Sequence, residues 1–220
     1  MTTLRIRPAP GEPVFEAWRE CALDDLVVEL TAGTGRIVVA VDGRSGSGKS
    51  TLAERLRRVT PGAVLVHTDD LAWHAPMFGW ADLARDGVLA PFHQNREVSY
   101  RPPAWDEHGR AGSIEVPPDT RVLFLEGVGS SQRTLTAVVD RAVWVQSDLA
   151  ESRRLGLARD IASGENGDEQ QSREFWEWWE SHELAFLRDD RPWERADAVV
   201  AGVGSPVGEA TLHVAERGGE

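Results

Sequence analysis

The segment at residues 41–56, VDGRSGSGKSTLAERL, constrains the fold more than any other part of the chain. It overlaps the run RIVVAVD at 36–42, whose β-branched residues predict a strand buried on both faces. The residues from about Gly48 to Arg58 predict a helix. A strand therefore passes into a helix through a loop whose glycines leave the backbone N–H groups open.

The spacing Gly43-x-x-x-x-Gly48-Lys49-Ser50 is that of a P-loop, and it stands between a buried strand and a helix, as the motif requires. The N–H groups of the loop and the positive end of the helix are expected to cradle the phosphates of a nucleotide triphosphate. Lys49 is predicted to reach the β- and γ-phosphates, and the Ser50 hydroxyl to ligate Mg²⁺.

Composition limits the classes of partner. A formal net charge of −12 disfavours nucleic acid, and no apolar run approaches the ~20 residues that cross a bilayer. The single cysteine, Cys21, excludes an internal disulfide, and the first residues lack the apolar centre of a signal peptide. We therefore expect a cytoplasmic protein that binds small molecules, with no nucleic acid and no membrane as partner.

Buried runs alternate with helical segments along the chain. The runs lie at 36–42, 63–68, 121–127, 141–147 and 196–202. This alternation predicts an α/β fold, with a five-stranded parallel sheet and helices on both faces. We expect one domain over 1–220, with a leading amphipathic helix within 1–34, an irregular insertion at 70–118 and a mobile lid region at 149–172.

A P-loop alone leaves the function open, since GTPases, motor ATPases and small-molecule kinases all use one. The chain has no Asn-Lys-x-Asp segment to read guanine and no Leu-Ser-Gly-Gly signature of transporter ATPases. The third strand ends in one acid, Glu126, which suits a metal but supplies no evident activator of water. A small-molecule kinase is favoured. The alternatives are a nucleotide switch acting as a regulatory or assembly protein, and a slow hydrolase.

Two further groups complete the predicted site. Asp69 and Asp70 follow the second strand, whose carboxyl end lies beside the P-loop in a parallel sheet. One of them can take a proton from an acceptor hydroxyl, and the other can cap the next helix. Arg154 and Arg159 lie on a predicted helix that runs into a polar loop, where an arginine can clamp a triphosphate or pair with a neighbouring acid.

These segments together resemble the uridine kinase-like branch of P-loop kinases, which includes pantothenate and nicotinamide riboside kinases. The resemblance rests on VAVDGRSGSGKSTLA, HTDD, LFLEGV and VQSDLAESRRLGLARDI, and covers roughly 36–162. It implies a kinase that uses ATP or GTP with Mg²⁺, with Asp69 as the base and near the metal, Glu126 near the metal and Arg159 on the lid. The chain departs from the branch at Leu155 and Gly156, where paired arginines are usual.

The insertion at 70–118 is where we expect the acceptor to bind. Its aromatic side chains can stack on a base or a sugar, and its polar side chains can read hydroxyl groups. This favours a nucleoside or sugar-like acceptor, whereas the helix around 175–183 is predicted mainly to pack. The predicted acceptor-binding residues are Asp70, Trp73, His74, Trp80, Arg96, Tyr100, Arg101 and Trp105. The predicted nucleotide-binding residues are Gly43, Ser45, Gly46, Ser47, Gly48, Lys49, Ser50, Thr51 and Arg154.

Overall fold

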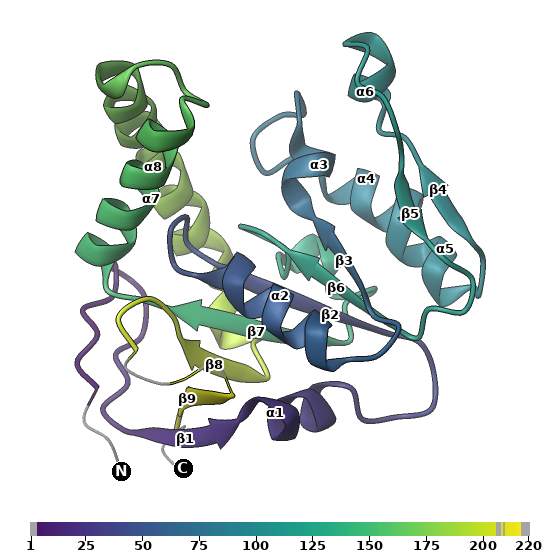
Figure 1. The fold of residues 1–220 in the computed structure, drawn as a ribbon, viewed down its shortest axis with the longest axis horizontal. Coiled ribbons are helices and arrows are strands. Elements are labelled where there is room, and N and C mark those ends of the chain that lie inside the picture. Colours follow the sequence, from purple (N-terminus) through teal and green to yellow (C-terminus); the bar gives the residue numbers. More distant parts are fainter. Residues whose placement is uncertain (1–3, 206–207, 209, 217–220) are drawn as a thin grey trace.

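A central sheet of seven strands organises the computed structural model, which describes residues 4–205, 208 and 210–216 (Figure 1). The strand order is β1-β9-β8-β7-β2-β6-β3. These strands are β1 (Trp18–Ala22), β2 (Ile37–Gly43), β3 (Val64–His67), β6 (Val122–Glu126), β7 (Arg141–Gln146), β8 (Ala198–Ala201) and β9 (Thr211–Ala215). A separate antiparallel pair is formed by β4 (Val98–Tyr100) and β5 (Ile114–Val116).

The five predicted parallel strands are confirmed. Strands β8, β7, β2, β6 and β3 pair in parallel, and β9 and β1 extend the sheet through antiparallel pairings. The carboxyl ends of β2, β3 and β6 therefore meet at one edge. This edge receives the P-loop after β2, the acidic pair after β3 and Gly127 after β6.

Helices cover both faces of the sheet. They are α1 (Leu23–Leu30), α2 (Lys49–Val59), α3 (Thr68–Ala72), α4 (Ala81–Ala84), α5 (Ala90–His93), α6 (Pro103–Glu107), α7 (Leu149–Ser163) and α8 (Glu169–Asp190). A π-helical turn spans Arg85–Leu89, and 3₁₀ turns span Arg133–Leu135 and Pro192–Glu194. Of the helices that the structure describes, none combines the length and apolar character needed to cross a bilayer.

The alternation of side chains along β2 separates two cores. Val39 and Val41 pack with α1 and α2 on one face, whereas Val38 packs with α3–α5 and the β4–β5 pair on the other. Because successive strand residues point to opposite faces, one apolar strand serves both cores. A third cluster joins Trp144 of β7 to Leu187 of α8. It fixes the base of α8 against the sheet.

The predicted leading helix within 1–34 is wrong in its first half. Residues 18–22 form the edge strand β1, paired with β9 from Trp18↔Ala215 to Ala22↔Thr211, and only Leu23–Leu30 is helical. The apolar spacing at 15–22 fits a helix, but pairing with the end of the chain supplies hydrogen bonds that local periodicity does not reveal. Residues 1–3 lie outside the described residues.

The lid region at 149–172 contains α7 and the start of α8. Asp148 accepts hydrogen bonds from the N–H groups of Ala150 and Glu151 and so begins α7, and Gly164, with a φ of 68°, ends it. Asp168 and Gln171 form a capping box that begins α8. These caps confine the connection between the two helices to the short loop at 164–168.

Candidate functional site

The P-loop has the open backbone that phosphate binding needs. Its glycines, Gly43, Gly46 and Gly48, all have positive φ angles. A Cβ on Gly46 would lie 2.1 Å from the carbonyl oxygen of Ser152, so glycine lets the loop lie directly against α7. Gly48 begins α2 without any side-chain cap. The first N–H groups of α2 are therefore free of side-chain acceptors and fit an anion.

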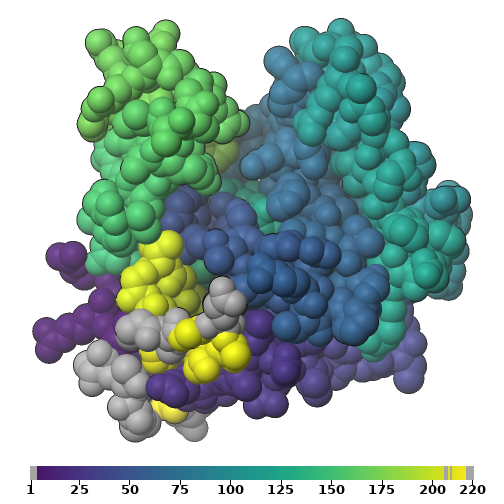
Figure 2. All heavy atoms as spheres, in the orientation of Figure 1, coloured from purple at the N-terminus to yellow at the C-terminus, as the bar shows by residue number. Residues whose placement is uncertain are grey.

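A cleft of about 470 Å³ opens in front of this loop. Figure 2 shows the hollow between the lobe formed by α7 and α8 and the lobe formed by the insertion. The cleft brings together predicted residues from four separate segments. Its lining includes Ser45, Gly46, Lys49, Ser50, Asp69, Glu126 and Arg159.

Lys49 is the only lysine in the chain, and the other 23 residues of the Lys and Arg total are arginines. An ammonium is a compact point charge, which suits a position surrounded by phosphate oxygens better than a planar guanidinium does. The positive charge of Lys49 acts on Glu126, the cleft carboxylate at the end of β6. The basic charge at the front of the P-loop is thus supplied by the one residue type that the motif specifies.

Glu126 lies between two partners. Its Oε1 accepts a hydrogen bond from the Ser50 hydroxyl at 2.9 Å, and its Oε2 lies 2.6 Å from His67 Nδ1. Burial opposes its charge, but the His67 hydrogen bond, the charge of Lys49 and the Ser50 hydroxyl together lower the pKa of Glu126. The carboxylate therefore stays ionised next to a hydroxyl oxygen.

This pair of oxygens fits Mg²⁺, a hard cation that prefers oxygen ligands and keeps several waters. Within the part of the chain that the structure describes, no three acidic, histidine or cysteine side chains form a complete cation site. Ser50 and Glu126 are suited to share such a cation with phosphate oxygens. They are the two residues predicted for that role in addition to Asp69.

The structure separates the two acids that follow β3. Asp69 lines the cleft, whereas Asp70 forms an ion pair with Arg110 and is absent from the cleft lining. The Asp70 carbonyl also accepts a hydrogen bond from Trp105 Nε1 at 2.9 Å. Neither acid caps α3, which begins after His67 without a side-chain cap. Asp69 is the acid that faces the P-loop cleft, and Asp70 fastens the insertion.

The predicted lid arginines lie in different surroundings. Arg159 lines the cleft and pairs with the buried Asp160, which also accepts a hydrogen bond from Trp176 Nε1 at 2.7 Å. Arg154 is exposed and pairs with Glu151 at 2.6 Å, away from the cleft lining. Of the two, only Arg159 is positioned to meet a bound phosphate.

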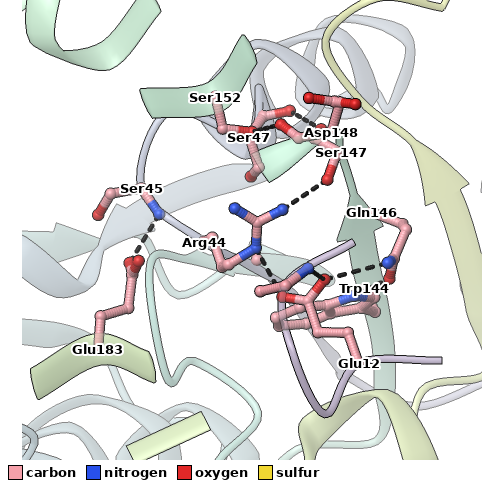
Figure 3. Close-up of polar contacts among 12 residues, drawn as sticks. Glu12, Arg44, Ser45, Ser47, Trp144, Gln146, Ser147, Asp148, Ser152 and Glu183 are labelled. Atoms are coloured by element: carbon pink, nitrogen blue, oxygen red, sulfur yellow. Dashed lines mark hydrogen bonds and ion pairs between the residues drawn. The ribbon is translucent and has the colours of Figure 1, made fainter. Parts of the chain in front are cut away.

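A buried ion pair supports the P-loop from behind, and sequence reasoning missed it. Arg44, the second residue of the motif, donates to Glu12 Oε1 at 2.6 Å and to the carbonyl of Ser147 (Figure 3). Both side chains of the pair are almost wholly buried. Gln146 Nε2 donates to the other Glu12 oxygen at 3.0 Å. The sequence signal for this ion pair was the charged Arg44 in a P-loop that follows an apolar strand, since a buried arginine requires an anionic partner.

A second buried carboxylate, Asp42 at the end of β2, ties the P-loop strand to the loop after β6. Asp42 accepts hydrogen bonds from the N–H groups of Gly43, Gly129 and Ser131 and from the Ser131 hydroxyl, at 2.7–3.0 Å. Gly127 permits the approach of Thr68, whose Oγ1 would lie 1.7 Å from a Cβ there. The two strand ends that flank the P-loop are therefore held close together.

The opposite wall of the cleft comes from α8, which was predicted mainly to pack. Phe175, Trp176 and Trp179 line the cleft. The rings of Phe175 and Trp179 stack at 6.3 Å with an interplanar angle of 16°. Trp176 is buried, so packing is confirmed for that ring, while Phe175 and Trp179 present aromatic surface. Spacing at i and i+4 indicated a shared face but not what that face meets.

None of the eight predicted acceptor-binding residues, all of which are described, lines the cleft. Trp73 and His74 gather with His108, whose ring stacks on His74 at 3.9 Å. The Arg110 guanidinium lies 3.9 Å from the ring centroid of Trp105. This cluster packs the tip of the insertion.

The other four residues predicted to bind the acceptor lie in the core or on other surfaces of the insertion. Trp80 is 2% exposed within the core beneath the insertion, so its ring has no free surface in this conformation. Arg96 and Tyr100 line a separate hollow. Arg101 pairs with Asp106 at 2.7 Å.

The fold is similar to those of solved proteins. One, described as "a Possible Uridine Kinase from Bacillus stearothermophilus", has a TM-score of 0.50 and 17% identity, covering 80% of this chain and 96% of that one. Another, described as "YGR205w protein", has a TM-score of 0.57 and 12% identity, covering 90% of this chain and 100% of that one. No family model and no curated protein matches the chain. The likeness shows that the chain shares the fold of these proteins, as the predicted resemblance implies.

Proposed function

We propose that the protein is a phosphotransferase that moves the γ-phosphoryl group of ATP to a hydroxyl of a small molecule. The observation that carries the proposal is the placement of Asp69 in the same cleft as Lys49 and the P-loop. A nucleotide switch needs the loop and its cation but no proton acceptor for a second substrate. A kinase needs such a group to orient and deprotonate its acceptor.

The nucleotide side is supported by a second hollow of about 280 Å³. Lys49 and Arg159 line both hollows, and the second one adds Thr51, Leu155 and Val203. There is thus room beyond the phosphate cradle for the rest of a nucleotide, against partly apolar side chains. Lys49 would hold the β- and γ-phosphates, and Arg159 would neutralise charge on the group in transfer.

Ser50 and Glu126 are the residues that would hold Mg²⁺. When bound with the nucleotide, the cation supplies neutralisation of the phosphate charge. The ionised state of Glu126, which its partners favour, keeps the site ready for it. The main role proposed for Asp69 is to take the proton of the acceptor hydroxyl. Its predicted role as a ligand of Mg²⁺ is part of the same proposal.

The transfer step uses one proton acceptor. The Asp69 carboxylate takes the proton of the acceptor hydroxyl as that oxygen bonds to the γ-phosphorus. The bond from phosphorus to the bridging oxygen of ADP breaks, and ADP leaves with those electrons. Lys49 and Arg159 stabilise the negative charge that is redistributed over the phosphoryl oxygens. Positioning and electrostatics supply most of the rate in such reactions.

The acceptor is proposed to be a nucleoside or a sugar-like metabolite. Phe175 and Trp179 offer the aromatic wall on which a base or a sugar ring can lie, opposite Asp69. Glu165 and Asn166 of the loop between α7 and α8 also line the cleft and can accept or donate hydrogen bonds to hydroxyl groups. The insertion residues predicted for this role remain a prediction that requires the cleft to close.

The decisive experiment measures ADP release with Mg-ATP and a panel of hydroxyl metabolites, one at a time. Strict dependence on one compound is expected. Asp69→Asn should lower kcat by about 10²–10⁴-fold with little change in ATP affinity, and Asp70→Asn is the matched control that should remain active. Turnover without any acceptor, or loss in the Asp70 variant alone, would contradict the assignment.

The single lysine provides an independent check on nucleotide binding. A lysine-selective acylating reagent, followed by peptide mass spectrometry, reports on Lys49 because no other lysine exists. Mg-ATP should protect Lys49, and adenosine should protect it much less. Equal modification with and without Mg-ATP would show that phosphates do not reach this side chain. Tight binding without acceptor-dependent turnover would favour the nucleotide-switch alternative.

A further inference from the structure

Two residues of α8 hydrogen-bond the P-loop at one position. Glu183 Oε1 accepts the backbone N–H of Ser45 at 2.7 Å (Figure 3). Trp179 Nε1 donates to the Ser45 hydroxyl at 2.8 Å and to Glu183 Oε1 at 3.3 Å. The three residues form a closed triangle in which the backbone N–H and the hydroxyl of Ser45 both bond to α8.

The chemistry of Glu183 is unusual for its place. It is 3% exposed, and among the described residues it forms no ion pair. An unpaired buried carboxylate is costly, and one that touches an anion-binding loop also repels phosphate. Its hydrogen bonds to Ser45 and Trp179 offset part of that cost. The remaining cost must be offset by another effect. The contacts of Glu183 indicate that this effect is on the conformation of the P-loop.

The Ser45 N–H already donates to Glu183, so phosphate binding is left to the other N–H groups of the loop. The preceding residue, Arg44, is held by Glu12, and the Ser47 carbonyl accepts from the Ser147 hydroxyl at 2.7 Å. Consecutive turns of the loop are thus fastened to different parts of the chain. Only the Ser45 attachment comes from a helix that also lines the cleft.

Trp179 belongs to both sides of the site. Its indole N–H binds the loop, and its ring forms part of the cleft wall between Phe175 and Phe78, whose centroids lie 6.3 and 5.7 Å away. A compound that presses on this ring shifts a group that is hydrogen-bonded to Ser45. By linkage, a nucleotide that orders the P-loop also orders this wall.

We propose that Trp179 and Glu183 are positioning residues, which hold the P-loop in its phosphate-binding shape and couple it to the acceptor side of the cleft. The inference rests on the proposed function, because it assigns the loop to nucleotide phosphates. It adds a role for α8 that neither the P-loop motif nor the predicted site residues contain.

The test is calorimetric titration of a non-hydrolysable ATP analogue with Mg²⁺, at a temperature at which melting curves show every variant folded. Trp179→Phe keeps the aromatic wall and removes the N–H donor. Glu183→Ala removes the acceptor, and Glu183→Gln keeps a carbonyl oxygen in its place. Trp179→Phe and Glu183→Ala should each weaken binding about tenfold, whereas Glu183→Gln should recover most of the affinity. Trp178→Phe, on the exposed neighbour, should bind as the wild type does.

The double variant Trp179→Phe/Glu183→Ala distinguishes positioning from general destabilisation. If both residues act through Ser45, the double variant should bind no more than about threefold weaker than the poorer single variant. Additive losses, or unchanged affinity in both single variants, would overturn the inference while leaving the proposed function intact. Failure of the wild type to bind the analogue at all would instead refute the proposed function. Should Glu183→Ala not fold, Trp179→Phe and Glu183→Gln decide the question.

Discussion

The buried pair of Glu12 and Arg44 offers the sharpest test of how the P-loop is supported. Glu12 Oε1 accepts from Arg44 Nε at 2.6 Å, and the exposed fractions of the two side chains are 2% and 3%. Glu12 lies in the segment before β1, so this contact joins the start of the chain to the nucleotide-binding loop (Figure 3). Glu12→Ala would leave the Arg44 guanidinium buried with only the Ser147 carbonyl as partner.

The expected magnitude follows from the burial of both charges. Removing one partner of a buried ion pair costs about 3–5 kcal/mol in the free energy of unfolding, because the other charge remains uncompensated. A domain of ordinary stability has about 5–15 kcal/mol in all. Replacing both partners, as in Glu12→Leu with Arg44→Met, should recover only part of the loss. Gln146 Nε2 would then lose its bond to Glu12, and the Ser147 carbonyl would lose its bond to Arg44.

The assay is equilibrium urea denaturation followed by tryptophan fluorescence. At a slope of about 2 kcal/mol per molar urea, the loss in Glu12→Ala corresponds to a midpoint lower by about 1.5–2.5 M. Glu16→Ala, an exposed neighbour, is the control and should stay within about 0.5 kcal/mol of the wild type. A Glu12→Ala midpoint within the range of this control would refute the claim that the pair holds the loop.

Three further predictions concern α7 and the titration of Glu12. Gly156→Ala should lower the free energy of unfolding by about 1–3 kcal/mol, because the new Cβ would lie 2.2 Å from the buried Trp176 ring. An unchanged urea midpoint would show that the ring moves freely. Asp148→Ala should cost about 1 kcal/mol in a thermal melt, because α7 loses its N-terminal cap, and a cost near zero would exclude that role. Burial raises the pKa of Glu12 above its ordinary 4.5, so the native state keeps this proton after the unfolded chain has released it. Stability should therefore fall as pH rises from 4.5 through the folded-state pKa, and equal slopes in the wild type and Glu12→Gln would contradict this.

The phosphate side of the site was predictable because backbone geometry dictates its sequence. The glycines that the loop needs and the buried strand before it are local features. The parallel sheet then brings the ends of β2, β3 and β6 to one edge, so Lys49, Asp69 and Glu126 converge without any knowledge of side-chain packing. The placement of Asp69 in the cleft follows from strand order alone.

The edge strand and the supporting charges were not predictable, because both depend on distant partners. Residues 18–22 have helical spacing, yet they pair with β9, nearly two hundred positions later in the chain. In the sequence, Arg44 occupies a variable position of the motif, and only the structure shows that it pairs with Glu12. In each case the local sequence indicates that a partner is required, but it does not identify the distant residue that supplies it.

The acceptor side of the cleft was less predictable for a related reason. Tryptophans in the insertion at 70–118 suggested a binding surface, but Trp80 fills the core and Trp105 packs under Arg110. The aromatic surface that lines the cleft comes from α8 instead, where the same spacing is typical of packing against a sheet. The two interpretations differ only in whether the neighbouring surface is protein or cleft, which tertiary structure decides.

The supports of the P-loop also explain why its front can remain open. Loop glycines are entropically costly to order, and a loop without partners would sample many shapes before phosphate arrived. Here the order is imposed from behind, through Glu12 on Arg44 and Glu183 on Ser45, while the N-terminus of α2 keeps its N–H groups without side-chain caps. The free energy spent on burying two carboxylates thus preorganises the site, so that less of the binding energy of a nucleotide is needed to shape the loop.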